Sequence, residues 1–158
     1  MIANQNLIVP HLTTALTGPL QNLERIILNN QTTIESWFRN AWRDVQLPFY
    51  ASVDIRNSGY KIAPVDTNLF PSGFNNLNSS FESLCIHAAQ MAIEHTQLPI
   101  DKILIIPENH TRNLFYLENI ASLQSIIQKA GFEVRIGTLM EDITTPTRIE
   151  LDSSNTVL

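Results

Sequence analysis

The stretch that most constrains the fold of this chain runs from residue 102 to residue 138. Residues 102–107 form a short, continuous apolar run, which is typical of a strand buried on both faces. Residues 132–138 have the pattern of a second strand. The helix between them follows the apolar positions Leu117, Ile120, Leu123, Ile127 and Ala130. This order predicts two parallel strands joined by a right-handed crossover.

The residues that flank the helical patterns indicate where the helices begin and end. Asn113 or Thr111 is placed to cap the helix after the first strand, and Gly131 occupies the C′ position at its end. An earlier helix is expected to open at Ser79, because Glu82 three residues later completes a capping box.

The N-terminal half predicts a long helix and a strand. Apolar residues at three-, four- and seven-residue steps place one helix from about Pro19 to about Val45, although Asn29 and Asn30 weaken its middle. Residues 49–56 alternate between apolar and polar side chains, as in a strand with one apolar face.

These elements predict the fold class. We expect a single α/β domain over residues 1–158, three-layer-like, with a short, mostly parallel sheet and a long N-terminal helix. Residues 148–151 have the pattern of a further strand, and nothing after them is expected to close the unit.

Composition narrows the class of partner. Charged residues make up 16% of the chain, against roughly 25% in an average soluble protein, so another domain or subunit is expected to cover part of the surface. The net charge of −5 argues against a nucleic-acid partner. One cysteine, Cys85, excludes an internal disulfide and favours a reducing, cytoplasmic location. No signal peptide or run long enough to span a membrane is visible.

Asp54 and Arg56 are the first candidate site residues, because both lie on the polar face of the predicted strand. Two interpretations are open. The side chains either neutralise each other, or they bind a zwitterionic ligand, with Asp54 accepting from an ammonium and Arg56 gripping a carboxylate.

Residues 57–78 are expected to form a long irregular segment, and such segments inside compact domains are usually functional or disordered. Its apolar residues argue against disorder. Its candidate ligand-binding side chains are Asn57, Lys61, Asp66, Asn68, Asn75 and Asn76. Each is also an ordinary turn or surface residue, so the prediction of ligand binding depends on how many of them occur in one segment and not on any single residue. Asp54 and Asp66 are weak candidates for a magnesium site, and no His or Cys spacing predicts a metal centre.

The turn at residues 108–113 is a second candidate, because ligands of open α/β sheets bind between a strand end and a helix start. Arg112 would add a positive charge there and His110 a hydrogen-bonding group; the alternative is a plain helix cap. No glycine-rich nucleotide loop occurs. His87 and His95 are expected to be structural or surface residues, and Cys85 a small buried hydrophobe.

Long blocks of the chain resemble one class of bacterial glutamate–cysteine ligase. The blocks are residues 50–77, beginning Tyr-Ala-Ser-Val-Asp-Ile-Arg-Asn-Ser-Gly, residues 106–115 with Pro-Glu-Asn-His-Thr-Arg-Asn, residues 9–20 and residues 131–137. The resemblance covers most of residues 8–140.

This resemblance implies an enzyme that joins L-glutamate to L-cysteine with ATP and Mg²⁺ in the first step of glutathione biosynthesis. It implies a pre-ATP-grasp-like fold and an N-terminal substrate part that is incomplete for catalysis, with ATP and metal bound mainly by a remaining ligase domain outside this chain. The residues expected to bind substrate are Asp54, Arg56, Lys61, Asp66, Asn68, Asn75, Asn76, His110 and Arg112. The alternative is a non-catalytic ligand-binding or oligomerisation module derived from such a ligase. A homo-oligomer is a candidate assembly in either case.

Overall fold

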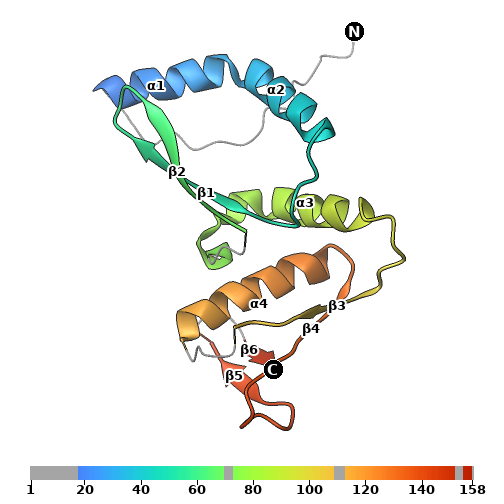
Figure 1. The fold of residues 1–158 in the computed structure, drawn as a ribbon. Helices are drawn as coiled ribbons and strands as arrows, with labels where there is room; N and C mark the ends of the chain where they lie inside the picture. The colour runs from blue at the N-terminus through green and yellow to red at the C-terminus, as the bar shows by residue number, and fades with distance from the viewer. Residues whose placement is uncertain (1–17, 70–72, 109–112, 152–154, 158) are drawn as a thin grey trace. The chain divides into compact units, whose positions relative to one another are not determined.

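The computed structural model describes residues 18–69, 73–108, 113–151 and 155–157 (Figure 1). The chain divides into two compact units, Met1–Pro71 and Ser72–Leu158, and each is described by itself below. The prediction of one continuous domain stays a prediction.

The described part of the first unit begins with two helices, α1 (Gly18–Asn29) and α2 (Gln31–Arg43). The prediction of one long helix is therefore wrong at Asn30, which adopts φ −106° and ψ 10°. Its side-chain Nδ2 donates to the carbonyl oxygen of Ile26 at 2.8 Å. Asparagine ends helices in this way because its amide competes with the backbone for hydrogen bonds.

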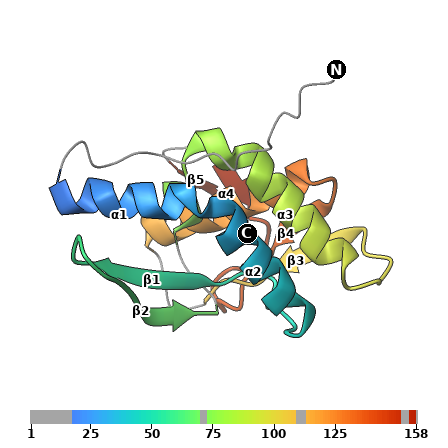
Figure 2. The same ribbon diagram turned by 90° about the horizontal axis from the view of Figure 1, so that it is seen from above.

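The rest of the first unit is an antiparallel hairpin of β1 (Ser52–Asn57) and β2 (Ile62–Asn68) (Figure 2). The predicted strand at residues 49–56 is confirmed with later bounds. The prediction of an irregular segment is wrong for β2, whose proline and polar residues resemble a loop. The strands turn at Gly59 (φ +84°), and the amide of Ser58 donates to the carbonyl of Lys61 at 3.1 Å.

A β-bulge shapes the hairpin. Asp54 lies opposite Asp66, but the next residue, Ile55, lies opposite Pro64, so Val65 is the extra residue of β2. Because side chains alternate between faces, a regular register would place Ile62 and Asp66 on the same face. The bulge separates them, which lets Ile62 join the apolar face while Asp66 joins the polar face.

The second unit contains the predicted strand–helix–strand motif. Strand β3 (Lys102–Ile105) pairs in parallel with β4 (Glu133–Ile136), and α4 (Leu114–Lys129) connects them. Helix α4 also contacts α3 (Glu82–Glu94). The buried apolar core of this unit is Ile93, Leu117, Ile120, Ala121, Leu123, Ile127, Val134 and Ile136. The expectation that the first strand is buried on both faces is wrong, since Leu104 is 60% exposed.

The ends of α4 follow the sequence predictions. The side chain of Asn113 accepts from the amide of Phe115 at 3.0 Å, which confirms the N-cap. Gly131 at φ +104° ends the helix, in a conformation that costs a residue with a side chain more than it costs glycine. The capping box at Ser79 is wrong: Asn78 caps a short 3₁₀ helix, η2 (Ser79–Phe81), that precedes α3.

A final hairpin pairs β5 (Arg148–Glu150) with β6 (Asn155–Val157). The predicted strand is confirmed, and its pairing with β6 was not predicted from the sequence. The α/β class is confirmed as mixed helices and small sheets. The described strands form three two-stranded sheets, with only β3 and β4 parallel, rather than one mostly parallel sheet.

Candidate functional site

Four polar side chains gather on one face of the β1–β2 hairpin, and we name them the hairpin cluster: Asp54, Arg56, Asp66 and Asn68. Asp54 and Arg56 are two residues apart on β1 and therefore share a face, as predicted. The register places Asp66 directly opposite Asp54. Asn68 donates from Nδ2 to Oδ2 of Asp66 at 3.3 Å, and the amide of Thr67 donates to Oδ1 of Asp66 at 2.9 Å.

The charges of the hairpin cluster are not neutralised locally. Directly opposite like charges destabilise a strand pair, so the facing Asp54 and Asp66 attract a cation. Among the residues that the structure describes, Arg56 makes no ion pair with either carboxylate. The interpretation that Asp54 and Arg56 neutralise each other is therefore not what the structure shows. The face offers two anionic groups and one cationic group to a ligand.

Lys61 lies in the hairpin turn. Its carbonyl oxygen accepts from the amide of Ser58 and, at 3.3 Å, from the Ser58 hydroxyl. Its exposed side chain extends from the end of the hairpin, where Asn57 also accepts from the amide of Gly59 at 2.8 Å. The turn therefore holds the backbone of Lys61 and leaves its ammonium group in solvent.

Asn75 and Asn76 lie in the second unit, on the 3₁₀ helix η1 (Phe74–Asn76). A buried residue of α4 that the sequence reasoning missed, Asn119, holds this segment. Its Oδ1 accepts from the amides of Gly73 at 2.6 Å and Phe74 at 2.8 Å, and only 3% of the residue is exposed. The available signal was a polar residue among the regularly spaced apolar positions of α4, between Leu117 and Ile120.

A groove of about 300 Å³ adjoins η1, a volume at the lower limit of ligand pockets. Polar lining residues are Asn75, Asn78, Ser79, Glu82, Ser122 and Ser125. Cys85 also lines the groove and is only partly buried, so the expectation of a buried cysteine is wrong. Glu82 pairs with Lys129 at the rim.

The structure thus brings the candidate residues together in two sets. One is the hairpin cluster with the neighbouring Lys61, and the other is Asn75 with Asn76. His110 and Arg112 lie outside the described residues, and their placement in the same cleft stays a prediction. His87 and His95 are exposed on or beside α3, which agrees with the interpretation of surface histidines.

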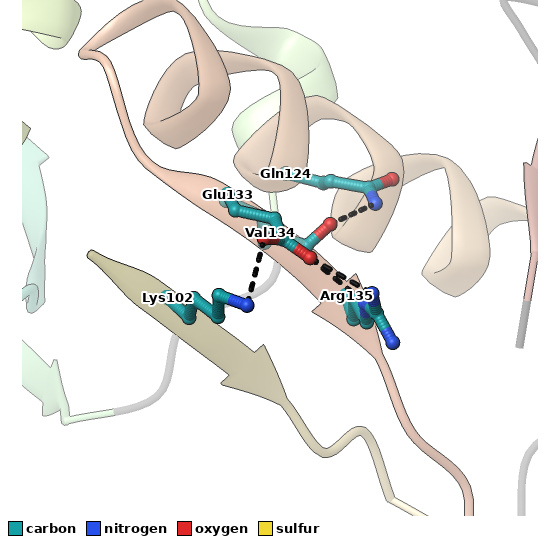
Figure 3. A network of polar contacts seen from close by, with 5 residues as sticks. All are labelled: Lys102, Gln124, Glu133, Val134 and Arg135. Atoms are coloured by element: carbon teal, nitrogen blue, oxygen red, sulfur yellow. Dashed lines mark hydrogen bonds and ion pairs between the residues drawn. The ribbon is translucent and has the colours of Figure 1, made fainter.

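A separate charged network lies on the β3–β4 pair (Figure 3). Lys102 pairs with Glu133 at 3.4 Å, and Arg135 pairs with the same carboxylate at 2.9 Å. The hydrogen bonds from Lys102 and then from Arg135 lower the pKa of Glu133 below its ordinary value. These exposed side chains link β3 to β4 through the shared carboxylate of Glu133.

Two kinds of site are not found in the described part of the chain. It contains no group of three or more His, Cys, Asp or Glu side chains able to hold a metal ion. None of its helices is both long enough and apolar enough to cross a membrane.

The described residues have a mixed α/β architecture, and comparison with known proteins identifies the family. Residues 24–158 match the family model described as glutamate–cysteine ligase, and the chain belongs to this family. It is also similar to a crystal structure from Methylobacillus flagellatus KT of a protein assigned as a gamma-glutamylcysteine synthetase, with 56% sequence identity and a TM-score of 0.76. The similarity covers 96% of this chain but 36% of that protein. The search of curated proteins gave no match.

Proposed function

We propose that this chain is the amino-acid substrate part of a glutamate–cysteine ligase, which forms gamma-glutamylcysteine in glutathione biosynthesis. Family membership and the 56% identical protein support the activity. The observation that carries the site assignment is the hairpin register, which places Asp54, Asp66 and Arg56 on one face without an ion pair among them.

The chemistry of the hairpin cluster suits a free amino acid. The Arg56 guanidinium presents parallel N–H donors that match the two oxygens of an α-carboxylate. Asp54 and Asp66 accept from the α-ammonium, whose positive charge also relieves the repulsion between them. Lys61, Asn68, Asn75, Asn76, His110 and Arg112 are further substrate-binding residues in this proposal. These groups bind and orient the substrate.

In this proposal ATP and Mg²⁺ are bound mainly outside this chain, in an ATP-grasp-like portion of a longer ligase. Among the residues that the structure describes, no group of three or more His, Cys, Asp or Glu side chains could hold a metal ion by itself, and Mg²⁺ is usually bound by one or two carboxylates together with substrate phosphates. The chain spans 36% of the similar Methylobacillus protein, which leaves room for such a portion. The single cysteine suits a cytoplasmic location.

The site assignment is tested by Arg56→Ala in a chimera in which this chain replaces the matching part of the Methylobacillus protein. Loss of a bidentate arginine–carboxylate contact weakens binding by about 1.5–3 kcal/mol, so the KM for glutamate rises at least about tenfold. Arg43→Ala, an exposed arginine at the end of α2, is the matched control and leaves KM unchanged. A change below about threefold for Arg56→Ala contradicts the assignment.

A second candidate function is a non-catalytic oligomerisation module. It is favoured by the exposed aromatic side chains of α2, since Trp37 is 64% and Trp42 is 52% exposed, and exposed apolar patches mark interaction sites. Sedimentation velocity separates the two functions. A stable oligomer that Trp37→Lys dissolves, with no binding of glutamate, cysteine or ATP in calorimetric titrations, supports the module instead of the ligase part.

A further inference from the structure

The two faces of the β3–β4 pair have different environments. One face carries Val134 and Ile136, which are each 5% exposed, and α4 packs on β4. Gln124 of α4 also donates from Nε2 to the carbonyl of Val134 at 3.2 Å (Figure 3). The residues between these positions must point to the other side because side chains alternate along a strand.

We name the other side the open sheet face: Lys102, Leu104, Ile106, Glu133, Arg135 and Gly137. Lys102 lies opposite Glu133 and Leu104 opposite Arg135. Gly137 continues the ladder by donating to the carbonyl of Ile105 at 2.8 Å. Leu104 and Ile106 are 60% and 56% exposed, so this face has an apolar end that is mostly open to solvent.

Such a face is unusual for parallel strands. Parallel sheets are almost always covered on both faces, and an isolated two-stranded sheet is at best marginally stable in water. Within the described residues, β3 and β4 pair only with each other, so each strand also has a free edge. We propose that the open sheet face and its edges are a docking surface for the remaining portion of a full-length ligase of this family.

Two observations favour that occupant. The similar Methylobacillus protein is matched over only 36% of its length, so a ligase of this family has ample additional chain to supply a strand and an apolar layer. The open sheet face also has a defined chemistry. Glu133 neutralises one of the two cations beside it, Lys102 and Arg135, which leaves a net positive charge next to the apolar end. The docking segment is therefore apolar, to cover Leu104 and Ile106, and bears an acidic group beside them.

The test compares Leu104→Asp in two settings: the 158-residue chain and the chimera with the Methylobacillus protein. In the chain alone the side chain is in solvent, so the thermal midpoint changes by less than about 2 °C. In the chimera the introduced carboxylate is buried, and the midpoint of the unit falls by at least about 5 °C. Gln128→Asp, on the exposed end of α4, is the matched control and has a small effect in both settings.

Hydrogen exchange provides a second measurement on unsubstituted protein. The outer-edge amides of β3 and β4 exchange at least about tenfold more slowly in the chimera than in the chain alone, because a docked strand protects them. Both measurements report stability, not ligation, so an inactive chimera with protected strands would contradict the proposed function alone.

Three outcomes overturn the proposal. Equal midpoint changes for Leu104→Asp in the two settings show that nothing docks on this face in the longer protein. A large loss already in the 158-residue chain shows that the chain itself covers Leu104. A dimer of the 158-residue chain that Leu104→Asp dissociates assigns the face to a second copy.

Discussion

Asn119 provides a direct test of how the second unit positions the segment that carries the candidate residues Asn75 and Asn76. Its side-chain oxygen accepts from the amides of both Gly73 and Phe74, and these contacts join α4 to a segment 45 and 46 residues earlier in the chain. Asn119→Ala removes the acceptor and leaves two backbone donors without a partner. Because Gly73 has φ +134°, the segment depends on a conformation that few residues adopt and that local sequence alone does not enforce.

The magnitude follows from burial. Leaving a buried donor without an acceptor costs about 1–3 kcal/mol. Asn119 is 3% exposed, but Gly73 and Phe74 are only half-buried, so water replaces part of each lost bond. We expect Asn119→Ala to lower the free energy of unfolding by about 2 kcal/mol in total. At an ordinary urea dependence for a small protein, the unfolding midpoint falls by about 1 M.

The assay is urea unfolding followed by circular dichroism, together with hydrogen exchange at the two amides. An opening free energy lower by about 2 kcal/mol corresponds to exchange about 30-fold faster at Gly73 and Phe74. Asn119→Asp keeps the acceptor oxygens and should recover part of the stability, whereas Gln128→Ala on the exposed end of α4 should change little. A loss below about 0.5 kcal/mol for Asn119→Ala, or unchanged exchange at Gly73, would refute the reasoning.

Two further predictions concern the second unit. The ion pairs that lower the pKa of Glu133 stabilise the folded state at pH values above its unfolded pKa near 4.5, and this contribution is lost as the pH falls through the lower folded pKa. The thermal midpoints of wild type and Glu133→Gln should therefore differ at pH 7 and converge at acidic pH. A difference that stays constant with pH would show that these ion pairs do not stabilise the folded state. Gly131→Ala should destabilise the chain by about 1 kcal/mol because the backbone φ at this position is +104°, and not because of a clash, since a Cβ there meets nothing within 4 Å. Gly131→Asn should lower the free energy of urea unfolding by less, because asparagine tolerates this conformation better than alanine. Equal losses for the two variants would refute the conformational explanation.

Elements with a strong local pattern were predictable from the sequence. The β3–α4–β4 motif follows from an apolar run, a helical repeat and a second strand, and the helix between the strands predicts their parallel pairing. Asn113 and Gly131 terminate α4 as their chemistry predicts. The shared face of Asp54 and Arg56 required only the period of a strand.

Features that depend on contacts between distant residues were decided by the tertiary structure. Strand β2 contains Pro64 and several polar residues, so only its pairing with β1 makes it a strand, and the bulge at Val65 places Asp66 opposite Asp54. The role of Asn119 depends on backbone donors 45 and 46 residues away. The sequence by itself determined helix α4 with its two ends, the parallel motif and the family resemblance, because these depend on local patterns and on long blocks of similar residues. The tertiary structure alone decided which polar groups face one another, because hydrogen-bond partners and strand register depend on residues that no local pattern connects.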